Sequence, residues 1–394
     1  MNIFLYICIV MLNKKYKIVY CTPALYMAGG VERVLTLKAN YFAEHFGYDI
    51  TIILTEGKDK PLFYPLSAKI NVINLNIGFE ELWNCSFFKK IYVYLCKQYL
   101  FKKKLTAEIL HIKPDITVSL LRREINFISK IQDGSKKVGE LHINRANYRN
   151  FDKNNSDVIK TLFSKLWMRN LVGKLQSLDK FVVLTEKDKE SWVELSNVSV
   201  IPDPLSFFPS SRSKLNNHRV IAVGRFSYEK GYDRLLTAWE KVSQVCYSWR
   251  LDIYGDGNRD TYESLVDTLN IDKNRCALHA RTSDIEYEYL NSTIFVCSSR
   301  FEGFGMVILE AMACGLPVVS FDCPWGPGSI IIDGVDGCLV NNGDIDAFAD
   351  KLISVIQDAD LRNKLSDNAI SKANKYAIES ISLRWKVLFD SLFE

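Results

Sequence analysis

The sequence predicts an α/β protein with two doubly wound domains, each built on a parallel sheet with helices on both faces. Three observations support this. At 394 residues the chain is long for a single core. Short apolar, β-branched segments alternate with longer helical patterns, and the alternation occurs twice. A polar stretch, 209–217, separates the two series and is interpreted as a linker.

The first series begins after a short apolar N-terminal segment. Its predicted strands are 18–21, 49–54, 70–73, 114–120, 137–142, 180–184 and 198–204. Helices are expected over 30–46 and 87–111. Alternating strands and helices favour a parallel sheet, because parallel neighbours need a crossover connection.

The second series has predicted strands over 219–223, 249–254, 293–299 and 317–320. A helix over 306–314 is indicated by its apolar run, by Gly315 at its end and by Pro317 beyond it. The last predicted helix, 379–393, is amphipathic.

The most informative segment is 300–317, which carries two carboxylates at different depths. Glu302 lies in a glycine loop after a buried strand, and Glu310 lies inside the apolar helix. A carboxylate in such a helix is costly unless it has a polar partner. Hydroxyl groups of a bound sugar or ribose would be suitable partners.

This pair of glutamates, eight residues apart, resembles the signature of family 4 retaining glycosyltransferases. Further segments resemble that family in the expected order. They are Gly29-Gly-Val-Glu-Arg-Val34, Val223-Gly-Arg225-Phe-Ser-Tyr-Glu-Lys230-Gly231, Ile253-Tyr-Gly-Asp-Gly257, Cys323-Pro-Trp-Gly-Pro327 and Asp333-Gly-Val-Asp-Gly337.

The resemblance implies the GT-B fold, two Rossmann-like domains facing across a cleft. It predicts an acceptor-binding domain over 1–208, a nucleotide-sugar-binding domain over 209–378 and a C-terminal helix, 379–394, that packs back on the first domain. The implied reaction is retaining, metal-independent transfer of a hexosyl group from a nucleotide sugar, with UDP the expected nucleotide and no cofactor.

The same resemblance assigns roles to individual residues. Arg225 and Lys230 would bind the donor's phosphates, since both follow a strand at the edge where open α/β sheets bind ligands. Glu302 would contact the transferred sugar and Glu310 the ribose. His142, at a strand end, would face the donor sugar from the first domain, although Glu140 is an alternative. The remaining expected donor-binding residues are Gly29, Gly30, Phe304, Gly305, Met306 and Val307, whose backbone can approach an anion closely.

The implied acceptor is a lipid-linked oligosaccharide or another saccharide of bacterial surface polysaccharide synthesis, such as lipopolysaccharide or capsule. The loop 323–327 favours an N-acetylhexosamine donor, but Trp325 within it and Asp203, where relatives often carry asparagine, depart from the family pattern. Two alternatives are a nucleotide-sugar epimerase of the same fold and a catalytically silent nucleotide-sugar-binding protein.

Two other motifs are expected to be structural. Asp344-Ile-Asp346 and Asp358-Ala-Asp360 resemble metal-binding motifs but fit a helix N-cap and a helix-end turn, so no metal is predicted. Gly255-Asp-Gly257 lacks the third glycine of a dinucleotide fingerprint, because Asp260 replaces it. Ten cysteines without a Cys-x-x-Cys pair indicate reduced thiols rather than a disulfide framework or a zinc site.

Charge suggests where the protein is found. The net charge is +4, with a basic first half and an acidic second half. No nucleic-acid module is recognisable, and an anionic membrane surface is the better partner. In 87–104, Lys90, Lys97 and Lys104 share a helical stripe beside Lys89 and Lys103. The residues expected on the opposite, apolar arc are Phe87, Phe88, Ile91, Tyr94, Leu95 and Phe101. We therefore expect a cytoplasmic protein, peripheral on the inner face of the cytoplasmic membrane. The apolar segment 1–12 does not fit a secretory signal, and translation starting at Met11 is an alternative.

Overall fold

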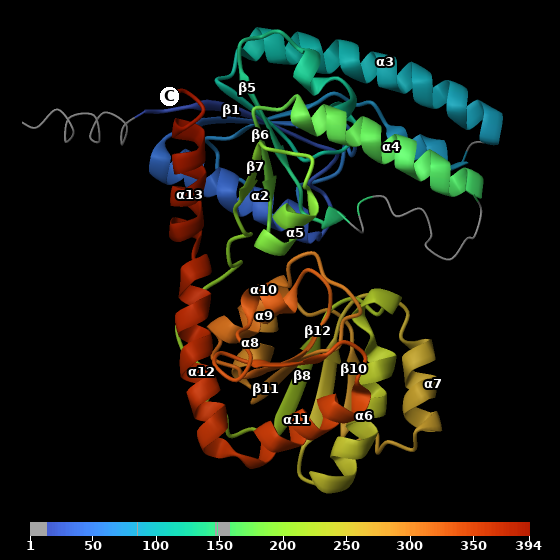
Figure 1. Ribbon diagram of the computed structural model, residues 1–394, viewed down its shortest axis with the longest axis vertical. Coiled ribbons are helices and arrows are strands. Elements are labelled where there is room, and N and C mark those ends of the chain that lie inside the picture. Colours follow the sequence, from blue (N-terminus) through green and yellow to red (C-terminus); the bar gives the residue numbers. More distant parts are fainter. Residues whose placement is uncertain (1–13, 85, 146–147, 149–157) are drawn as a thin grey trace, which may run out of the picture. The chain divides into compact units, whose positions relative to one another are not determined.

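The computed structural model describes residues 14–84, 86–145, 148 and 158–394 (Figure 1). The predicted N-terminal segment 1–12 lies outside these residues. The chain divides into two compact units, each with its own sheet and core. Unit 1 comprises Met1–Pro204 together with Ile378–Glu394, and unit 2 comprises Leu205–Ala377.

Unit 1 contains a seven-stranded parallel sheet in the order β3-β2-β1-β4-β5-β6-β7. Its strands are β1 (Lys17–Thr22), β2 (Asp49–Leu54), β3 (Asn71–Asn74), β4 (Ile116–Ser119), β5 (Lys136–Glu140), β6 (Lys180–Val183) and β7 (Val198–Val200). The inner strands are buried on both faces, as the unbroken apolar runs predict. The strand order reverses between β1 and β4, which creates a switch point at their carboxyl ends.

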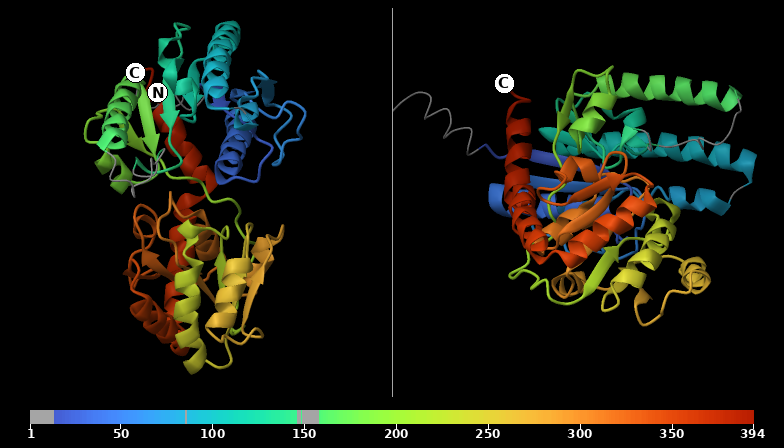
Figure 2. Two further views of the ribbon diagram at one scale, coloured as in Figure 1. Left: turned by 90° about the vertical axis from the view of Figure 1, so that its right-hand side faces the viewer. Right: turned by 60° about the horizontal axis from the view of Figure 1, so that its bottom comes forward.

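The helices of unit 1 cover this sheet. They are α2 (Gly30–Tyr41), extended by one π-helical turn over Phe42–Phe46, α3 (Phe87–Ile112), α4 (Val158–Gln176), α5 (Glu186–Ser191) and α13 (Ile378–Asp390). Although α13 is the last helix of the chain, it packs beside α2 (Figures 1 and 2). Its Trp385 and Phe389 are fully buried, and its Asp390 accepts a hydrogen bond of 2.7 Å from the Tyr16 hydroxyl.

Unit 2 contains a six-stranded parallel sheet in the order β10-β9-β8-β11-β12-β13. Its strands are β8 (Arg219–Val223), β9 (Arg250–Tyr254), β10 (Cys276–His279), β11 (Ile294–Cys297), β12 (Val318–Asp322) and β13 (Cys338–Asn341). Its helices are α6 (Tyr232–Val245), α7 (Asp260–Thr268), α8 (Ile285–Leu290), α9 (Met306–Ala313), α10 (Pro327–Ile330), α11 (Ile345–Gln357) and α12 (Ala359–Ala373). Here the switch point lies between β8 and β11.

The polar stretch predicted as a linker is part of unit 2. The first unit ends at Pro204, whereas the predicted first domain ends at 208. The chain returns to unit 1 at Ile378, one residue before the predicted start of the C-terminal helix. Ser213 in the middle of the stretch is buried, and its amide donates a 2.9 Å hydrogen bond to the Cys314 carbonyl. Its hydroxyl also bonds to the Ser292 carbonyl. Polar composition alone therefore did not locate the division between the units, because the polar groups of Ser213 are satisfied by backbone partners within unit 2.

The sequence predicts a basic stripe of Lys90, Lys97 and Lys104 on α3, and this prediction is wrong for Lys97 and Lys104. The Lys97 ammonium donates 2.7 Å hydrogen bonds to the carbonyls of Ile77 and Gly78. The Lys104 ammonium donates a 2.7 Å bond to the Leu75 carbonyl. Both lysines therefore face the segment after β3. Phe101 was expected on the apolar arc that faces a membrane, but it is buried in the core of unit 1, so this part of the prediction is also wrong.

Candidate active site

The strongest candidate site lies at the switch point of unit 2, where loops leave the carboxyl ends of β8 and β11. The Lys230 ammonium follows β8 and lies 2.7 Å from Oε1 of Glu302, which follows β11. The Ser299 hydroxyl donates a 2.6 Å hydrogen bond to the same carboxylate oxygen. The side chains of Lys230 and Glu302 are 16% and 10% exposed. Burial alone would lower the pKa of Lys230, but the Glu302 carboxylate outweighs it and raises the pKa.

Two glycines give the loops at this switch point their shape. Gly231 has a φ of 63°, and a Cβ there would lie 2.3 Å from the Ser298 carbonyl oxygen. Gly305 has a φ of 107° and forms the N-cap of α9. Both positions lie in the left-handed region that favours glycine. Gly231 therefore permits the close approach of the β8 and β11 loops, and Gly305 permits the turn into α9.

Arg225 is placed differently from Lys230, although both follow β8. Its side chain is 74% exposed, and its guanidinium pairs with Glu229 at 2.9 Å. The side chain is long and exposed, so it can turn toward a ligand at little cost. The predicted pair thus consists of one largely buried cation, Lys230, and one exposed cation, Arg225.

The N-terminus of α9 carries the other predicted donor-binding residues. Phe304 is buried and packs against Tyr376, with ring centroids 5.8 Å apart. Met306 and Val307 are half-buried in the first turn. The first amide groups of a helix lack intrahelical acceptors and attract anions.

Glu310 is buried inside α9 and has protein partners that the sequence did not reveal. Its carboxylate accepts hydrogen bonds from the Ser206 hydroxyl and, at 3.3 Å, from the Tyr289 hydroxyl. Ser206 comes from the segment before β8 and Tyr289 from α8. A buried carboxylate requires such partners, but their identity depends on tertiary packing.

In unit 1, Gly29 and Gly30 lie where the sequence predicts, between β1 and the start of α2. Gly29 is the N-cap of α2, and its carbonyl accepts a 3.1 Å bond from the Arg33 amide. A Cβ at Gly29 would clash with the Glu32 carboxylate, whereas one at Gly30 would meet nothing within 4 Å. Because the Glu32 side chain is flexible and Gly29 has a φ of −88°, the surrounding structure requires glycine at neither position.

His142 follows β5 and lies between two carboxylates. Its Nε2 is 3.1 Å from Oε1 of Glu140, and its Nδ1 is 3.1 Å from Oδ1 of Asp203. The Lys38 ammonium contacts the same Glu140 oxygen from α2. Sequence reasoning singled out His142 and Glu140 as alternatives, but the structure brings them together.

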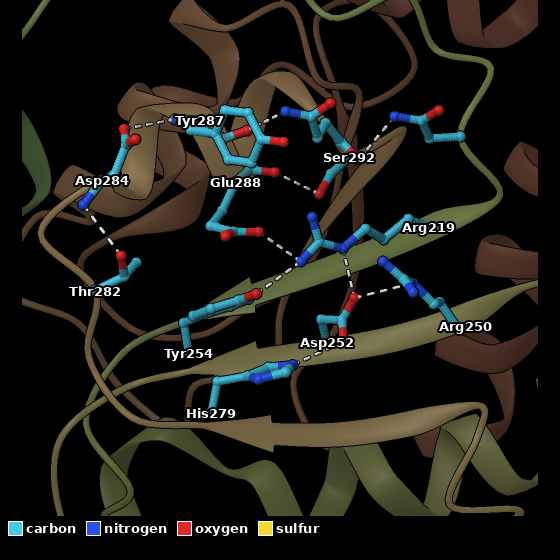
Figure 3. Close-up of polar contacts among 12 residues, drawn as sticks. Arg219, Arg250, Asp252, Tyr254, His279, Thr282, Asp284, Tyr287, Glu288 and Ser292 are labelled. Atoms are coloured by element: carbon cyan, nitrogen blue, oxygen red, sulfur yellow. Dashed lines mark hydrogen bonds and ion pairs between the residues drawn. The ribbon is translucent and has the colours of Figure 1, made fainter.

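A second buried polar network lies on the β8-β9-β10 part of the unit 2 sheet (Figure 3). Arg219 is bonded to Asp252, to the Tyr254 hydroxyl at 2.8 Å and to Glu288 at 2.7 Å. His279 lies 2.9 Å from the other Asp252 oxygen. Burial alone would raise the pKa of Asp252, but hydrogen bonds from His279 and Arg219 outweigh it and lower the pKa. No motif in the sequence pointed to this network, which ties three strands to α8.

The two aspartate motifs cap helices. Asp344 accepts a 3.0 Å bond from the Ala347 amide at the start of α11, and Asp358 accepts a 2.8 Å bond from the Leu361 amide at the start of α12. Within the described ranges, Glu140, His142 and Asp203 form the one cluster of three metal-ligating groups. The Lys38 ammonium already neutralises Glu140, so the arrangement fits an ion-pair network better than a metal site. The absence of a catalytic metal stays a prediction.

Comparison with known proteins supports the predicted fold and the predicted resemblance to glycosyltransferases. Residues 206–372 match the family described as Glycosyl transferases group 1. An uncharacterised glycosyltransferase of Haemophilus influenzae is 29% identical over 365 residues, covering 91% of this chain and 96% of that protein. The poly(ribitol-phosphate) alpha-N-acetylglucosaminyltransferase of Staphylococcus aureus is 28% identical over 267 residues, covering 65% of this chain and 51% of that protein.

Among solved structures, a mutant of S. aureus TarM in complex with Fondaparinux, alpha-GlcNAc-glycerol and UDP matches with a TM-score of 0.72 at 16% identity. The match covers 95% of this chain and 99% of that one. The predicted α/β fold with two Rossmann-like sheets is confirmed. Residues 206–372 match the group 1 glycosyl transferases and the chain has the GT-B fold, and together these findings support a glycosyltransferase.

Proposed function

We propose that the protein is a retaining, metal-independent glycosyltransferase of family 4 that transfers a hexosyl group from a UDP-sugar. The observation that carries the proposal is the Lys230–Glu302 pair at the β8/β11 switch point, 2.7 Å apart and largely buried. A carboxylate beside a buried cation suits a reaction in which the bond between a sugar and a diphosphate breaks. The named N-acetylglucosaminyltransferase relative supports a UDP-N-acetylhexosamine as the first donor to test.

The chemistry follows from where charge develops. As the glycosidic bond breaks, negative charge builds on the leaving diphosphate and must be stabilised in place. Lys230 and Arg225 supply positive charge after β8, and the first amides of α9 supply hydrogen-bond donors. Glu302 would contact the transferred sugar. Glu310 would accept hydrogen bonds from the ribose, and His142 would act from unit 1.

The proposed acceptor is a lipid-linked or other saccharide of bacterial surface polysaccharide synthesis. The staphylococcal relative named above acts on a poly(ribitol-phosphate), which supports an acceptor of this class. The TarM complex contains a glycan and UDP, which supports a site for both a saccharide and a nucleotide.

The test is a panel of nucleotide sugars screened for thermal stabilisation, followed by product analysis with saccharide acceptors. A ligand of the native state raises its stability, so the true donor should raise the melting temperature. We expect free UDP and a glycoside with the donor's anomeric configuration, and activity that persists in excess EDTA. An isomerised donor would indicate an epimerase, and binding without turnover would indicate a silent binding protein. Loss of activity in EDTA with rescue by manganese would overturn metal independence.

We also propose that the protein is peripheral on the cytoplasmic membrane through α3. Large apolar side chains line the solvent-facing side of this helix, namely Ile91, Tyr92, Leu95 and Tyr99. The flanking exposed lysines are Lys89, Lys90, Lys102 and Lys103. Aromatic and aliphatic groups beside lysines suit the interface of an anionic bilayer. None of the described helices has the length and apolar character needed to cross a bilayer.

Liposome sedimentation tests this assignment. Changing Lys89, Lys90, Lys102 and Lys103 to glutamate should abolish binding to anionic vesicles, since each lysine contributes about 1 kcal/mol near such a surface. The matched control changes the exposed lysines Lys58, Lys130, Lys187 and Lys189 of unit 1 to glutamate, which alters the net charge equally. Equal loss in both variants would mean that net charge, not α3, determines binding. Undiminished binding of the α3 variant would exclude this helix.

A further inference from the structure

Unit 1 contains a buried chain of alternating charges that ends beside the unit boundary. It runs from Lys38 on α2 to Glu140 on β5, then to His142 and to Asp203, the residue before Pro204. Lys38 and Glu140 are each 1% exposed, and Asp203 is 7% exposed. The His142 side chain is 6% exposed. These residues come from distant parts of the sequence, so it is the fold that brings the four charged groups together.

The geometry indicates the charge of the His142 ring. Both ring nitrogens lie 3.1 Å from a carboxylate oxygen. A neutral imidazole has one nitrogen lone pair, which would then point at a negative oxygen, whereas an imidazolium presents an N–H at each nitrogen. With Lys38 as the only other cation among the four, a neutral ring would leave one buried negative charge unbalanced. Buried charges are costly unless they are paired.

We propose that Glu140 and Asp203 are positioning residues that hold His142 as an imidazolium at the carboxyl end of β5. This proposal rests on the proposed function, in which His142 acts on the donor. A charged ring cannot serve as a general base. It supplies a fixed positive charge instead. Its Nε2 is buried and lies 3.1 Å from Glu140, so the ring would act on the site through its charge and not as a hydrogen-bond donor to the substrate.

The surrounding titratable groups support this charge state. Burial alone would lower the pKa of His142, but the Asp203 and Glu140 carboxylates outweigh it and raise the pKa to about 9. Burial alone would raise the pKa of Glu140, but Lys38 and His142 outweigh it and lower the pKa to about 2. Tyr20 on β1, also near Glu140, stays a neutral phenol because burial raises its pKa well above the usual value.

The first measurement is an NMR titration of the full chain with ¹⁵N-labelled histidine rings. The chain has five histidines, and the His142 signals are assigned by comparison with His142→Gln. In the wild type, both ring nitrogens of His142 should remain protonated at pH 7.5. The isosteric variant Asp203→Asn should lower the His142 pKa by roughly one to three units, the usual effect of removing a neighbouring opposite charge. His279, which lies beside Asp252 in unit 2, serves as the internal control and should not shift.

The second measurement is the pH dependence of kcat/KM. If the imidazolium is required, activity should fall as pH rises through the His142 pKa, and Asp203→Asn should move this alkaline limb down by the shift seen in NMR. A singly protonated His142 at pH 7.5, an unchanged pKa in Asp203→Asn, or an alkaline limb that does not follow the pKa would each overturn the proposal. The titration needs no turnover, so a failure of the proposed function would appear in the transfer assay and leave the titration result intact.

Discussion

Lys230 and Arg225 both follow β8, yet the protein holds them differently. Changing either residue to alanine should lower kcat/KM by an amount equivalent to about 2–4 kcal/mol of transition-state stabilisation. This is the usual loss when a charge-stabilising group is removed. Arg225→Ala should leave the melting temperature unchanged, because its side chain is 74% exposed. Lys230→Ala should lower it, because Glu302 loses its counter-ion. Arg212→Ala is the control, since it removes an exposed arginine paired with Asp367 in the same unit. Turnover within threefold of wild type would remove either residue from the site.

Changing Glu310 tests the proposed ribose contact and distinguishes it from a purely structural role of this carboxylate. Glu310→Gln keeps the shape of the side chain and loses its charge, so donor affinity should fall about tenfold or more, as when a charged hydrogen-bond partner is lost. Ser206→Ala is the matched variant, because it removes the hydroxyl that now bonds to Glu310 without touching the carboxylate. It should keep donor affinity, since a ribose hydroxyl can take the vacated position. A drop in melting temperature for Glu310→Gln with unchanged donor affinity would show a purely structural acid.

The His142 network also predicts how stability depends on pH. The folded-state pKa of His142 is raised from 6.5 to about 9, so its contribution is fully present below about pH 6.5 and is lost as pH rises through 9. Glu140 has the opposite sign: its contribution is present above pH 4.5 and is lost as pH falls toward 2. Urea unfolding from pH 6 to 10 should therefore show a falling free energy of unfolding. The fall should be smaller in Asp203→Asn, and an identical profile in both proteins would contradict the assignment.

At the scale of elements, α2 carries an unusual core residue. Lys38 lies under the Trp385 ring of α13, with its ammonium 4.3 Å from the ring centroid, and pairs with Glu140. Lys38→Met should destabilise folding by about 3–5 kcal/mol, because two buried carboxylates, Glu140 and Asp203, would then share the single positive charge of His142. Lys17→Met is the control, since Lys17 and Asp49 form an exposed pair worth less than about 1 kcal/mol. Urea denaturation of both variants measures the difference. Equal effects would mean that Lys38 is not a required counter-ion.

The strands show what the sequence can predict and why. All predicted strands are present, because β-branched runs bounded by glycine and polar residues favour parallel strands. The predicted strand 198–204 is shorter, since β7 ends at Val200, and the edge strands β10 and β13 were not predicted. The same pattern placed Lys230 and Glu302 at the ends of β8 and β11. Their meeting required the strand order, which brings those two strands together at the switch point.

The errors arose where tertiary contacts decide. On α3, a seven-residue spacing put Lys97 and Lys104 on one stripe, but spacing does not say which side of a helix faces the sheet. The carbonyls after β3 hold both lysines. Likewise, no local pattern links Ser206 or Tyr289 to Glu310, since the nearer of the two is 21 residues away in sequence.

For the whole molecule, the path of the chain makes unit 1 depend on its last helix. The chain leaves unit 1 after Pro204 and returns at Ile378, so α13 supplies part of the unit 1 core. Trp385→Ala should cost about 3–5 kcal/mol, as for other large buried aromatics. Val387→Ala on the exposed side of α13 should change the free energy of unfolding by less than about 0.5 kcal/mol.

Removing residues 378–394 should therefore affect the two units unequally. Unit 1 would lose Trp385 and Phe389 from its core, while every residue of unit 2 would remain. We expect calorimetry of the truncated chain to show a weakened or lost unit 1 transition, and UDP-sugars still to raise the melting temperature of unit 2, where Lys230, Glu302 and Glu310 lie. Transfer to the acceptor should fail, because the proposed reaction also needs His142 from unit 1. A truncated chain that unfolds like the wild type would show that α13 adds little to unit 1. Loss of the response to UDP-sugars despite an intact unit 2 transition would show that donor binding requires unit 1.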